Sequence, residues 1–322
     1  MLQAVLLFLL GFALLIKGGD WFVDGATGIA HRFHLPEILI GATVVSIGTT
    51  LPEVMVSSQA ALQNNGGISY GNAIGSIICN TSLIAALTIA IRPSEVKKQS
   101  LYLPSIAFFI AAIFYSLLAY AQGEFKRWQG IALLCGFLVY MIISVMQMKK
   151  SDEPQEVEEE KEGKETSLWM EIGLLVLGAA VIAVGARLLV DNGTLIASAL
   201  GVPDSVIGLT MVALGTSLPE LVTAVTALLK GHSALSLGNI IGANLFNIVL
   251  VSGAAMTISP FAVPAEKTIM NMNSSLVVDI PVMFIAMLLL CVPPLLKGKL
   301  YRAQGITLLL IYVAFLAYQF LI

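Results

Sequence analysis

One short motif occurs twice in the sequence, and each copy places an acidic residue inside an apolar segment. Gly48–Glu53 reads GTTLPE, and Gly215–Glu220 reads GTSLPE. A carboxylate near the middle of such a segment costs at least about 2.5–3.5 kcal/mol to insert into a membrane, so it indicates function. Two facing carboxylates repel each other unless a cation or a proton lies between them. Glu53 and Glu220 are therefore predicted to form the centre of a cation site.

The proline of each motif is predicted to free backbone carbonyl oxygens beside the glutamate. Pro52 has no N–H to bond the Gly48 carbonyl four residues back, and Pro219 leaves Gly215 in the same situation. Freed carbonyls in hydrocarbon need another partner, and a hard cation can be that partner. An ordinary proline kink is the alternative, but a kink does not explain the hydroxyl groups in both copies. The hydroxyl residues that accompany the glutamates are Thr49, Thr50, Thr216 and Ser217.

A second polar block follows each motif. Asn72, Ser76 and Asn80 are spaced by four and form one stripe along a helix. Asn80 and its repeat equivalent Asn247 are candidate cation ligands, with hydrogen bonding between helices as the alternative. Hydrogen bonding is favoured for Asn72 and its equivalent, Asn239. The same blocks contain two G-x-x-x-G patterns, which predict close helix packing: Gly71 with Gly75, and Gly238 with Gly242.

The elements that must position these residues are membrane spans. The chain has 322 residues, of which 57% are hydrophobic and only 11% charged, and its mean hydropathy is +0.90. A soluble domain has about 25% charged residues. Apolar stretches of about 20 residues can cross a bilayer as helices. An all-α membrane protein with ten spans is predicted: 3–28, 37–62, 68–91, 101–121, 128–147, 168–198, 205–229, 234–259, 276–294 and 303–321.

An acidic linker, residues 148–167, divides the chain into two sets of five spans, 1–147 and 168–322. An N-out, C-out arrangement puts 12 basic residues on the cytoplasmic side and 3 outside. Cytoplasmic loops carry the excess of Lys and Arg, so this orientation, with the linker in the cytoplasm, is predicted.

The two halves are related by an offset of 167 residues. Residues 41–90 align with 208–257 without a gap, and 17 of the 50 aligned positions are identical. Asp24 pairs in the same way with Asp191. Because each half has an odd number of spans, the second half is predicted to be inverted relative to the first. Inverted repeats are typical of secondary transporters, with the site at the midplane between them; a duplicated structural bundle is the alternative.

The candidate ligands supply only oxygen, from carboxylates, amides, hydroxyls and backbone carbonyls. Such donors suit Ca²⁺, Mg²⁺ or Mn²⁺ better than copper or zinc. Several ligands and flexible carbonyls favour Ca²⁺ over Mg²⁺, which dehydrates reluctantly. Two negative charges match one Ca²⁺, two Na⁺, or protons on the glutamates. Competing ions can therefore occupy overlapping positions, which is the physical basis of exchange.

At these motifs the chain resembles the calcium:cation antiporter superfamily, the membrane family of sodium/calcium exchangers. The residues that carry the resemblance look like the two alpha repeats of that family: Gly48–Glu53 with Gly71–Asn80, and Gly215–Glu220 with Gly238–Asn247. The compact size is similar to the prokaryotic branch. The resemblance implies a multi-pass protein of the prokaryotic plasma (inner) membrane that exchanges Ca²⁺ for Na⁺ by alternating access.

The resemblance also implies roles for individual residues. Glu53 and Glu220 would be the central Ca²⁺ ligands, and the backbone carbonyls of Thr49 and Thr216 would help to bind Ca²⁺ or Na⁺. Flanking Na⁺ sites would be formed by the side chains of Thr50, Ser217, Ser76 and Asn80. The first and sixth spans would slide across the rest of the protein to switch access between the two sides.

Two positions depart from the family pattern. Ala243 stands where the first repeat has Ser76, and Asn247 stands where exchangers of the family can have an acid. A Ca²⁺/H⁺ antiporter with the same glutamates therefore stays open. A passive channel is less favoured, because one inverted repeat per chain favours alternating access over a ring of pore-lining groups. No H-E-x-x-H motif or catalytic pairing indicates an enzyme. We expect no cofactor, nucleic acid or obligate protein partner; the expected partners are Ca²⁺, Na⁺ and the lipid bilayer.

Overall fold

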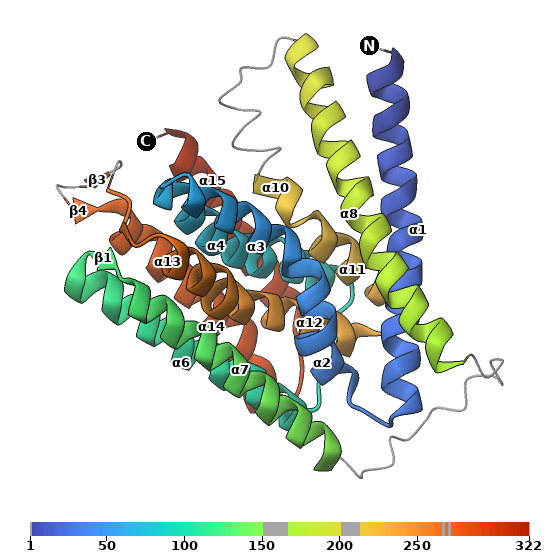
Figure 1. The fold of residues 1–322 in the computed structure, drawn as a ribbon. Helices are drawn as coiled ribbons and strands as arrows, with labels where there is room; N and C mark the ends of the chain where they lie inside the picture. The colour runs from blue at the N-terminus through green and yellow to red at the C-terminus, as the bar shows by residue number, and fades with distance from the viewer. Residues whose placement is uncertain (1, 151–166, 201–212, 266–267, 270–271, 322) are drawn as a thin grey trace.

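The computed structural model describes residues 2–150, 167–200, 213–265, 268–269 and 272–321. Within them the chain is almost entirely helical, as predicted (Figure 1). Eight of its helical segments are long and apolar enough to cross a membrane, and each coincides with a predicted span. These segments are Leu2–Arg32, Glu37–Leu62, Gly66–Ile91, Lys98–Gln122, Arg127–Met148, Leu168–Ile196, Ser233–Ile258 and Ser275–Lys297.

Several spans combine α-helical turns with a short π-helical segment. The first half of the chain contains α1 (Leu2–Arg32), α2 (Glu37–Ile40), η1 (Gly41–Val45), α3 (Ser46–Leu62), α4 (Gly66–Cys79), η2 (Asn80–Ala85), α5 (Ala86–Ile91), α6 (Lys98–Gln122) and α7 (Arg127–Lys150). The second half contains α8 (Leu168–Ala199), α10 (Ala213–Thr216), α11 (Leu218–Leu229), α12 (Ser233–Phe246), η4 (Asn247–Ser252), α13 (Gly253–Ile258), η5 (Ser275–Asp279), α14 (Ile280–Lys297) and α15 (Arg302–Leu321).

Two predicted spans are not among the eight segments. The span 205–229 corresponds to α10 and α11, which the structure describes from residue 213, and the span 303–321 corresponds to α15. Most of the acidic linker 148–167 lies outside the described residues. The total of ten spans, the inversion of the second half and the orientation in the membrane therefore stay predictions.

Short strands add to the helices and were not predicted. β1 (Glu124–Phe125) pairs antiparallel with β2 (Phe261–Ala262), and β3 (Thr268–Ile269) pairs with β4 (Met272–Asn273). Strands of two residues are too short to leave a periodic pattern of apolar residues, which explains why the sequence did not reveal them.

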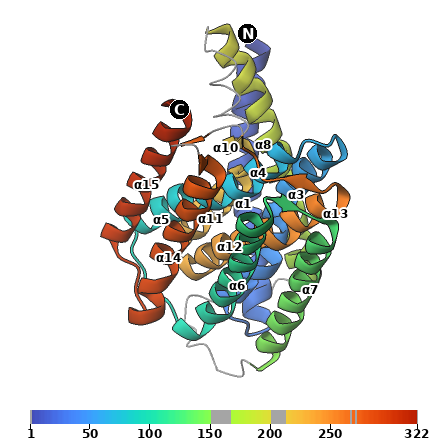
Figure 2. The same ribbon diagram turned by 90° about the vertical axis from the view of Figure 1, so that its left-hand side faces the viewer.

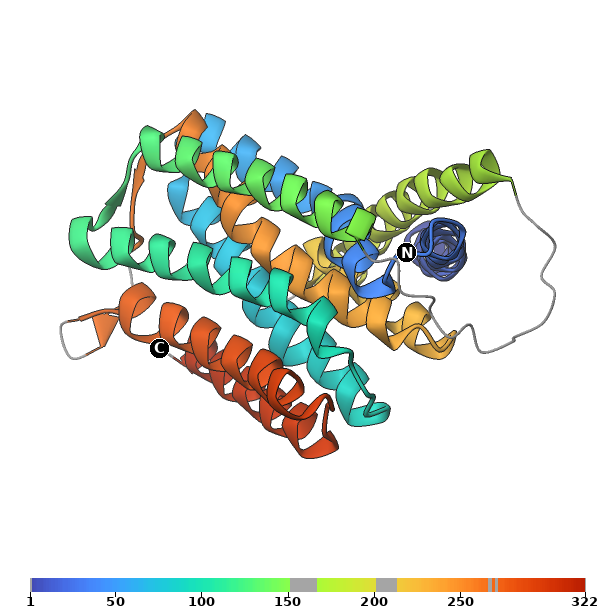
Figure 3. The same ribbon diagram turned by 90° about the horizontal axis from the view of Figure 1, so that it is seen from below.

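The long helices α1 and α8 cross each other at one side of the molecule (Figures 1 and 3). The N-terminal part of α1 and the C-terminal part of α8 extend past the other helices (Figure 2). Glycines bring the two backbones together: a Cβ at Gly11 would lie 2.8 Å from the Gly185 carbonyl oxygen, and one at Gly185 would lie 2.9 Å from that of Gly11. The guanidinium of Arg32 also binds both oxygens of Glu171, at 2.8 and 2.9 Å. The two helices therefore form a tightly joined pair.

α12 is buried along nearly its whole length. It contacts α2, η1, α3, α6 and α11. The close packing predicted at Gly238 and Gly242 is confirmed, because a Cβ there would lie 2.2 Å from the Ile38 carbonyl oxygen and 2.6 Å from the Ala42 Cα, respectively. The close packing predicted at Gly71 and Gly75 is wrong, because no described atom of another helix lies within 4 Å of a Cβ placed at either glycine.

Candidate cation site

The two motif glutamates lie in the core of this bundle. Glu53 lies within α3 and Glu220 in the first turn of α11, and both side chains are 0% exposed. The carboxylates are close enough to interact electrostatically. Neither has a hydrogen-bond partner among the described residues, although the Thr49 and Thr50 hydroxyls approach Glu220. Two buried negative groups in this arrangement need a cation or a proton.

The basic residues inside the predicted spans do not neutralise the glutamates. The ammonium group of Lys17 lies 5.7 Å from the centre of the Trp21 ring. Arg187 pairs with Asp191, at 3.6 Å between Nε and Oδ2, and its side chain is exposed. A structural ion pair therefore does not account for the two buried carboxylates, which favours a role in binding ions.

The two prolines act differently in the two halves. α3 continues through Pro52, whereas the helix of the second half is interrupted at Ser217, which has φ −89° and ψ 4°. The interruption makes Glu220 a first-turn residue of α11. Unpaired N–H groups give a helix N-terminus partial positive charge, which favours a carboxylate there. Sequence reasoning predicted freed carbonyls in both copies but not this difference between them.

Hydroxyl groups of both motifs are buried near the middle of the fold. Thr50 and Ser217 occupy equivalent positions in the two halves, and both hydroxyl oxygens are buried without a partner among the described residues. Ser76 is also buried, on α4. A buried hydroxyl without a partner costs free energy, which an ion bound to its oxygen can recover. These side chains are therefore suited to serve as ligands.

Two threonine–asparagine contacts join the halves of the chain. Thr49 donates a hydrogen bond to the Asn239 side-chain oxygen at 3.1 Å, and Thr216 donates to that of Asn72 at 3.4 Å. The Asn72 amide in turn donates to the Glu53 backbone carbonyl at 3.1 Å. The hydrogen-bonding interpretation of both asparagines agrees with these contacts. Asn72 and Asn239 therefore link the two halves of the chain beside the glutamate motifs.

Asn80 and Asn247 each begin a π-helical segment, η2 and η4. Neither polar atom of the Asn80 side chain has a partner among the described residues. The Asn247 amide donates to the Ala243 carbonyl at 3.0 Å, which leaves its Oδ1 without one. π-helical turns occur frequently at functional sites. No sequence signal predicts them, because a single i→i+5 turn does not change the apolar period enough to be seen.

The donor set is made of oxygen. Among the described residues no group of three or more His, Cys, Asp or Glu side chains could hold a metal ion. A cation bound between Glu53 and Glu220 would therefore complete its shell with hydroxyl, amide and backbone carbonyl oxygens or with water. This combination suits a hard cation that accepts several ligands in flexible geometry.

Comparison with known proteins places this arrangement in a family. The sodium/calcium exchanger protein family matches residues 3–146 and 170–321. The chain belongs to the sodium/calcium exchanger family. It is 32% identical to the sodium/calcium exchanger MaX1 of Methanosarcina acetivorans, over 98% of each chain. It is 37% identical to the inner membrane protein YrbG of Escherichia coli, over 81% of each chain.

The fold of this exchanger-family protein also matches solved structures. The sodium-calcium exchanger NCX_Mj, soaked with 10 mM Na⁺ and zero Ca²⁺, superimposes with a TM-score of 0.84 and 35% identity, covering 98% of both chains. The family is one of transporters and not of enzymes, so the present chain is a multi-pass cation antiporter of the membrane. The ligand roles of individual residues stay predictions.

Proposed function

We propose that the protein exchanges Ca²⁺ for Na⁺ across the membrane by alternating access, with no resident cofactor. The observation that carries the proposal is the pair of buried carboxylates, Glu53 and Glu220, which interact electrostatically and have no hydrogen-bond partner among the described residues. One Ca²⁺ between them balances both charges, and two Na⁺ do the same. Because the ions then compete for overlapping ligands, occupation by one favours release of the other.

The proposed ligand set extends from the two carboxylates to oxygen donors of both halves. Backbone carbonyls of Thr49 and Thr216 would contact Ca²⁺ or Na⁺, and buried oxygens without a protein partner would complete the shells. The side chains proposed to supply these oxygens are Thr50, Ser217, Asn80 and Asn247, with Ser76 beside them.

The moving part is proposed to be the α1–α8 pair. Its glycine contacts and the Arg32–Glu171 ion pair join the two helices more closely than either is joined to the bundle. Sliding of this pair past α3 and α11 would expose the glutamates first to one side and then to the other. The proposal includes ten spans, two inverted halves and an N-out, C-out orientation in a prokaryotic plasma membrane. The description of the relative YrbG as an inner membrane protein supports this location.

A test is to reconstitute the protein into liposomes and to measure radiocalcium uptake under an outward Na⁺ gradient. Uptake that requires Na⁺ inside, and that is absent from empty liposomes, is the expected result. Uptake without any counter-ion gradient would indicate a channel instead. Absence of uptake under every gradient, by protein that still binds Ca²⁺, would refute antiport.

Ca²⁺/H⁺ exchange is a second candidate, because two departures from the family pattern favour it. Ala243 offers no hydroxyl, and the amide of Asn247 is neutral and already donates to the Ala243 carbonyl. The second half therefore supplies fewer ligands for Na⁺ than the first. An outward H⁺ gradient is the parallel arm of the same assay: uptake driven by H⁺ alone would keep the fold and the glutamates but change the coupling ion.

A further inference from the structure

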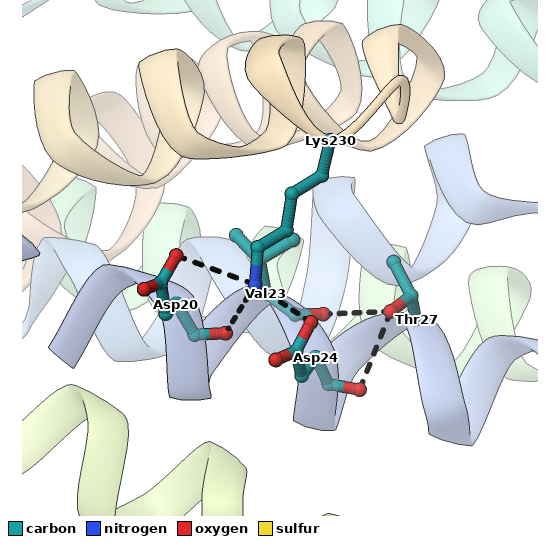
Figure 4. Close-up of polar contacts among 5 residues, drawn as sticks. All are labelled: Asp20, Val23, Asp24, Thr27 and Lys230. Atoms are coloured by element: carbon teal, nitrogen blue, oxygen red, sulfur yellow. Dashed lines mark hydrogen bonds and ion pairs between the residues drawn. The ribbon is translucent and has the colours of Figure 1, made fainter. Parts of the chain in front are cut away.

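Lys230, which follows the last residue of α11, joins that helix to α1 (Figure 4). Its ammonium nitrogen lies 2.8 Å from Oδ1 of Asp24 and 3.3 Å from Oδ1 of Asp20. It also donates a hydrogen bond to the backbone carbonyl of Asp20 at 3.1 Å. A lysine ammonium has three N–H donors, and three acceptors on α1 surround this one. The two aspartates, four residues apart, would repel each other without it.

The ion contacts lie at one end of a larger packing contact between α1 and α11. Val222, Thr226 and Lys230 are spaced by four residues, so they lie along one face of α11. A Cβ at Gly19 would lie 2.7 Å from the Val222 side chain and 2.8 Å from the Thr226 hydroxyl. The glycine therefore lets α1 approach this face closely, and the side chain of Lys230 then reaches Asp20 and Asp24.

The equivalent face in the first half is not covered in this structure. The offset of 167 residues relates Val222, Thr226 and Lys230 to Met55, Gln59 and Gln63 of α3. The Met55 side chain is 71% exposed, and both glutamines are exposed as well. Accordingly, α1 packs extensively on α11, whereas α8 makes only sparse contact with α3. If the α1–α8 pair moves as proposed, it therefore lies at one end of its movement in this structure.

The charged residues of the α1–α11 contact also differ from the residues at the equivalent positions of α8 and α3. The same offset relates Asp20 and Asp24 of α1 to Arg187 and Asp191 of α8. These two residues pair with each other, at 3.6 Å. The α3 residue that corresponds to Lys230 is Gln63, which carries no charge. If α8 came to rest on α3, no ion contact like that of Lys230 would form.

We infer that Lys230 is a positioning residue that holds the α1–α8 pair in one of its two transport positions, and that the other position has no corresponding contact. The inference rests on the proposed function, because it assumes that the pair moves. Movement toward α3 would separate Lys230 from Asp20 and Asp24 without forming a new ion pair. The ion contact therefore biases the protein toward the position seen here.

Replacement of Lys230 tests the bias. Lys230→Gln gives α11 the residue that α3 already has. Apparent affinity scales with the fraction of protein in the binding-competent position. In oriented vesicles, we expect the apparent KM for Ca²⁺ to rise on one side and to fall on the other, with the ratio of the two KM values changing by about two- to fivefold, as for loss of an exposed ion pair. A merely structural lysine would change both in the same direction.

Two further variants serve as controls. Lys230→Arg keeps the charge and should restore the wild-type ratio of the two KM values. Lys299 is also an exposed lysine with a carboxylate partner, Glu95, at 2.7 Å, but it lies outside the α1–α11 contact. Lys299→Gln should therefore leave that ratio unchanged. If Lys299→Gln shifts the ratio as much as Lys230→Gln, surface charge explains the effect and the inference is wrong.

A gain of function completes the test. Gln63→Lys combined with Arg187→Asp supplies on α3 and α8 the charges that α11 and α1 carry, so it stabilises the other position and should move the two KM values in the same direction as Lys230→Gln. Hydrogen exchange of purified protein gives a readout without transport: Lys230→Gln should speed amide exchange in α1 around Asp20 and Asp24. Wild-type protein that shows no exchange of ions would refute the proposed function, whereas active protein with unchanged KM ratio and unchanged hydrogen exchange in Lys230→Gln would refute this inference.

Discussion

The hydroxyl of Thr49 donates a hydrogen bond to the side-chain oxygen of Asn239, 3.1 Å away, and so joins α3 to α12 across the two halves of the chain. Thr216 and Asn72 make the equivalent contact with the halves exchanged, at 3.4 Å. The two copies of the motif therefore interlock around the glutamates instead of packing as separate units. Each glutamate region depends on an asparagine from the opposite half.

Asn239→Ala should weaken the site without removing its charge. Loss of the acceptor leaves the buried Thr49 hydroxyl with a long contact, 3.5 Å, to the Ser46 carbonyl and with its approach to Glu220. We expect a loss of about 1 kcal/mol of stability and a several-fold slower Ca²⁺ uptake, measured by thermal unfolding in detergent and by liposome flux. Complete loss of uptake with unchanged stability would instead indicate that Asn239 is an ion ligand.

Glu53→Gln and Glu220→Gln should each abolish transport while the protein stays folded. Glutamine has the shape of the glutamate but removes half of the negative charge that balances Ca²⁺. In Ca²⁺-free buffer the melting temperature should be unchanged or higher, because repulsion between the carboxylates is removed. Ca²⁺ should raise the melting temperature of wild-type protein only, because a ligand that binds the folded state stabilises it. Near-normal uptake by either variant would contradict the central role of the pair.

Ala243→Ser and Asn247→Asp should strengthen Na⁺ binding. The first adds the hydroxyl that Ser76 supplies in the other half, and the second adds a negative charge where Asn247 already has a free oxygen. A lower Na⁺ concentration should then suffice for half-maximal Ca²⁺ release from loaded liposomes. If neither variant changes the Na⁺ dependence, these positions do not contact the coupling ion.

Sequence reasoning predicted the spans well because apolar length decides them, and it predicted the packing of Gly238 and Gly242 because small residues are required where backbones approach. It missed features that depend on tertiary contacts. The π-helical turns at Asn80 and Asn247 leave no compositional signal. The interruption at Ser217, absent at its equivalent Thr50, occurs although both motifs contain the same proline. Similar local sequences thus adopt different geometries when their neighbours differ.

The ion pair between Glu95 and Lys299, which lies between spans, should not contribute to the pH dependence of transport near neutrality. The ammonium group lowers the pKa of Glu95 below its usual 4.5, and the carboxylate raises the pKa of Lys299 above 10.5. The pair is therefore lost only as pH falls through the lowered pKa or rises through the raised one. Glu95→Gln should leave the profile of Ca²⁺ uptake between about pH 6 and 8 unchanged. A changed profile would mean that this contact is coupled to transport.

Gly185→Ala should impair the protein through the crossing of α1 and α8. The added methyl group would lie 2.9 Å from the Gly11 carbonyl oxygen and 3.0 Å from the Leu15 nitrogen, both backbone atoms, so the helices must separate. Overpacking of this kind costs about 1–3 kcal/mol. We expect a lower melting temperature in detergent and reduced Ca²⁺ uptake. Gly136→Ala in α7 is the matched control, because no described atom lies within 4 Å of a Cβ there. If both variants behave alike, the α1–α8 pair is not held by glycine packing, and its movement as one unit loses its main structural support.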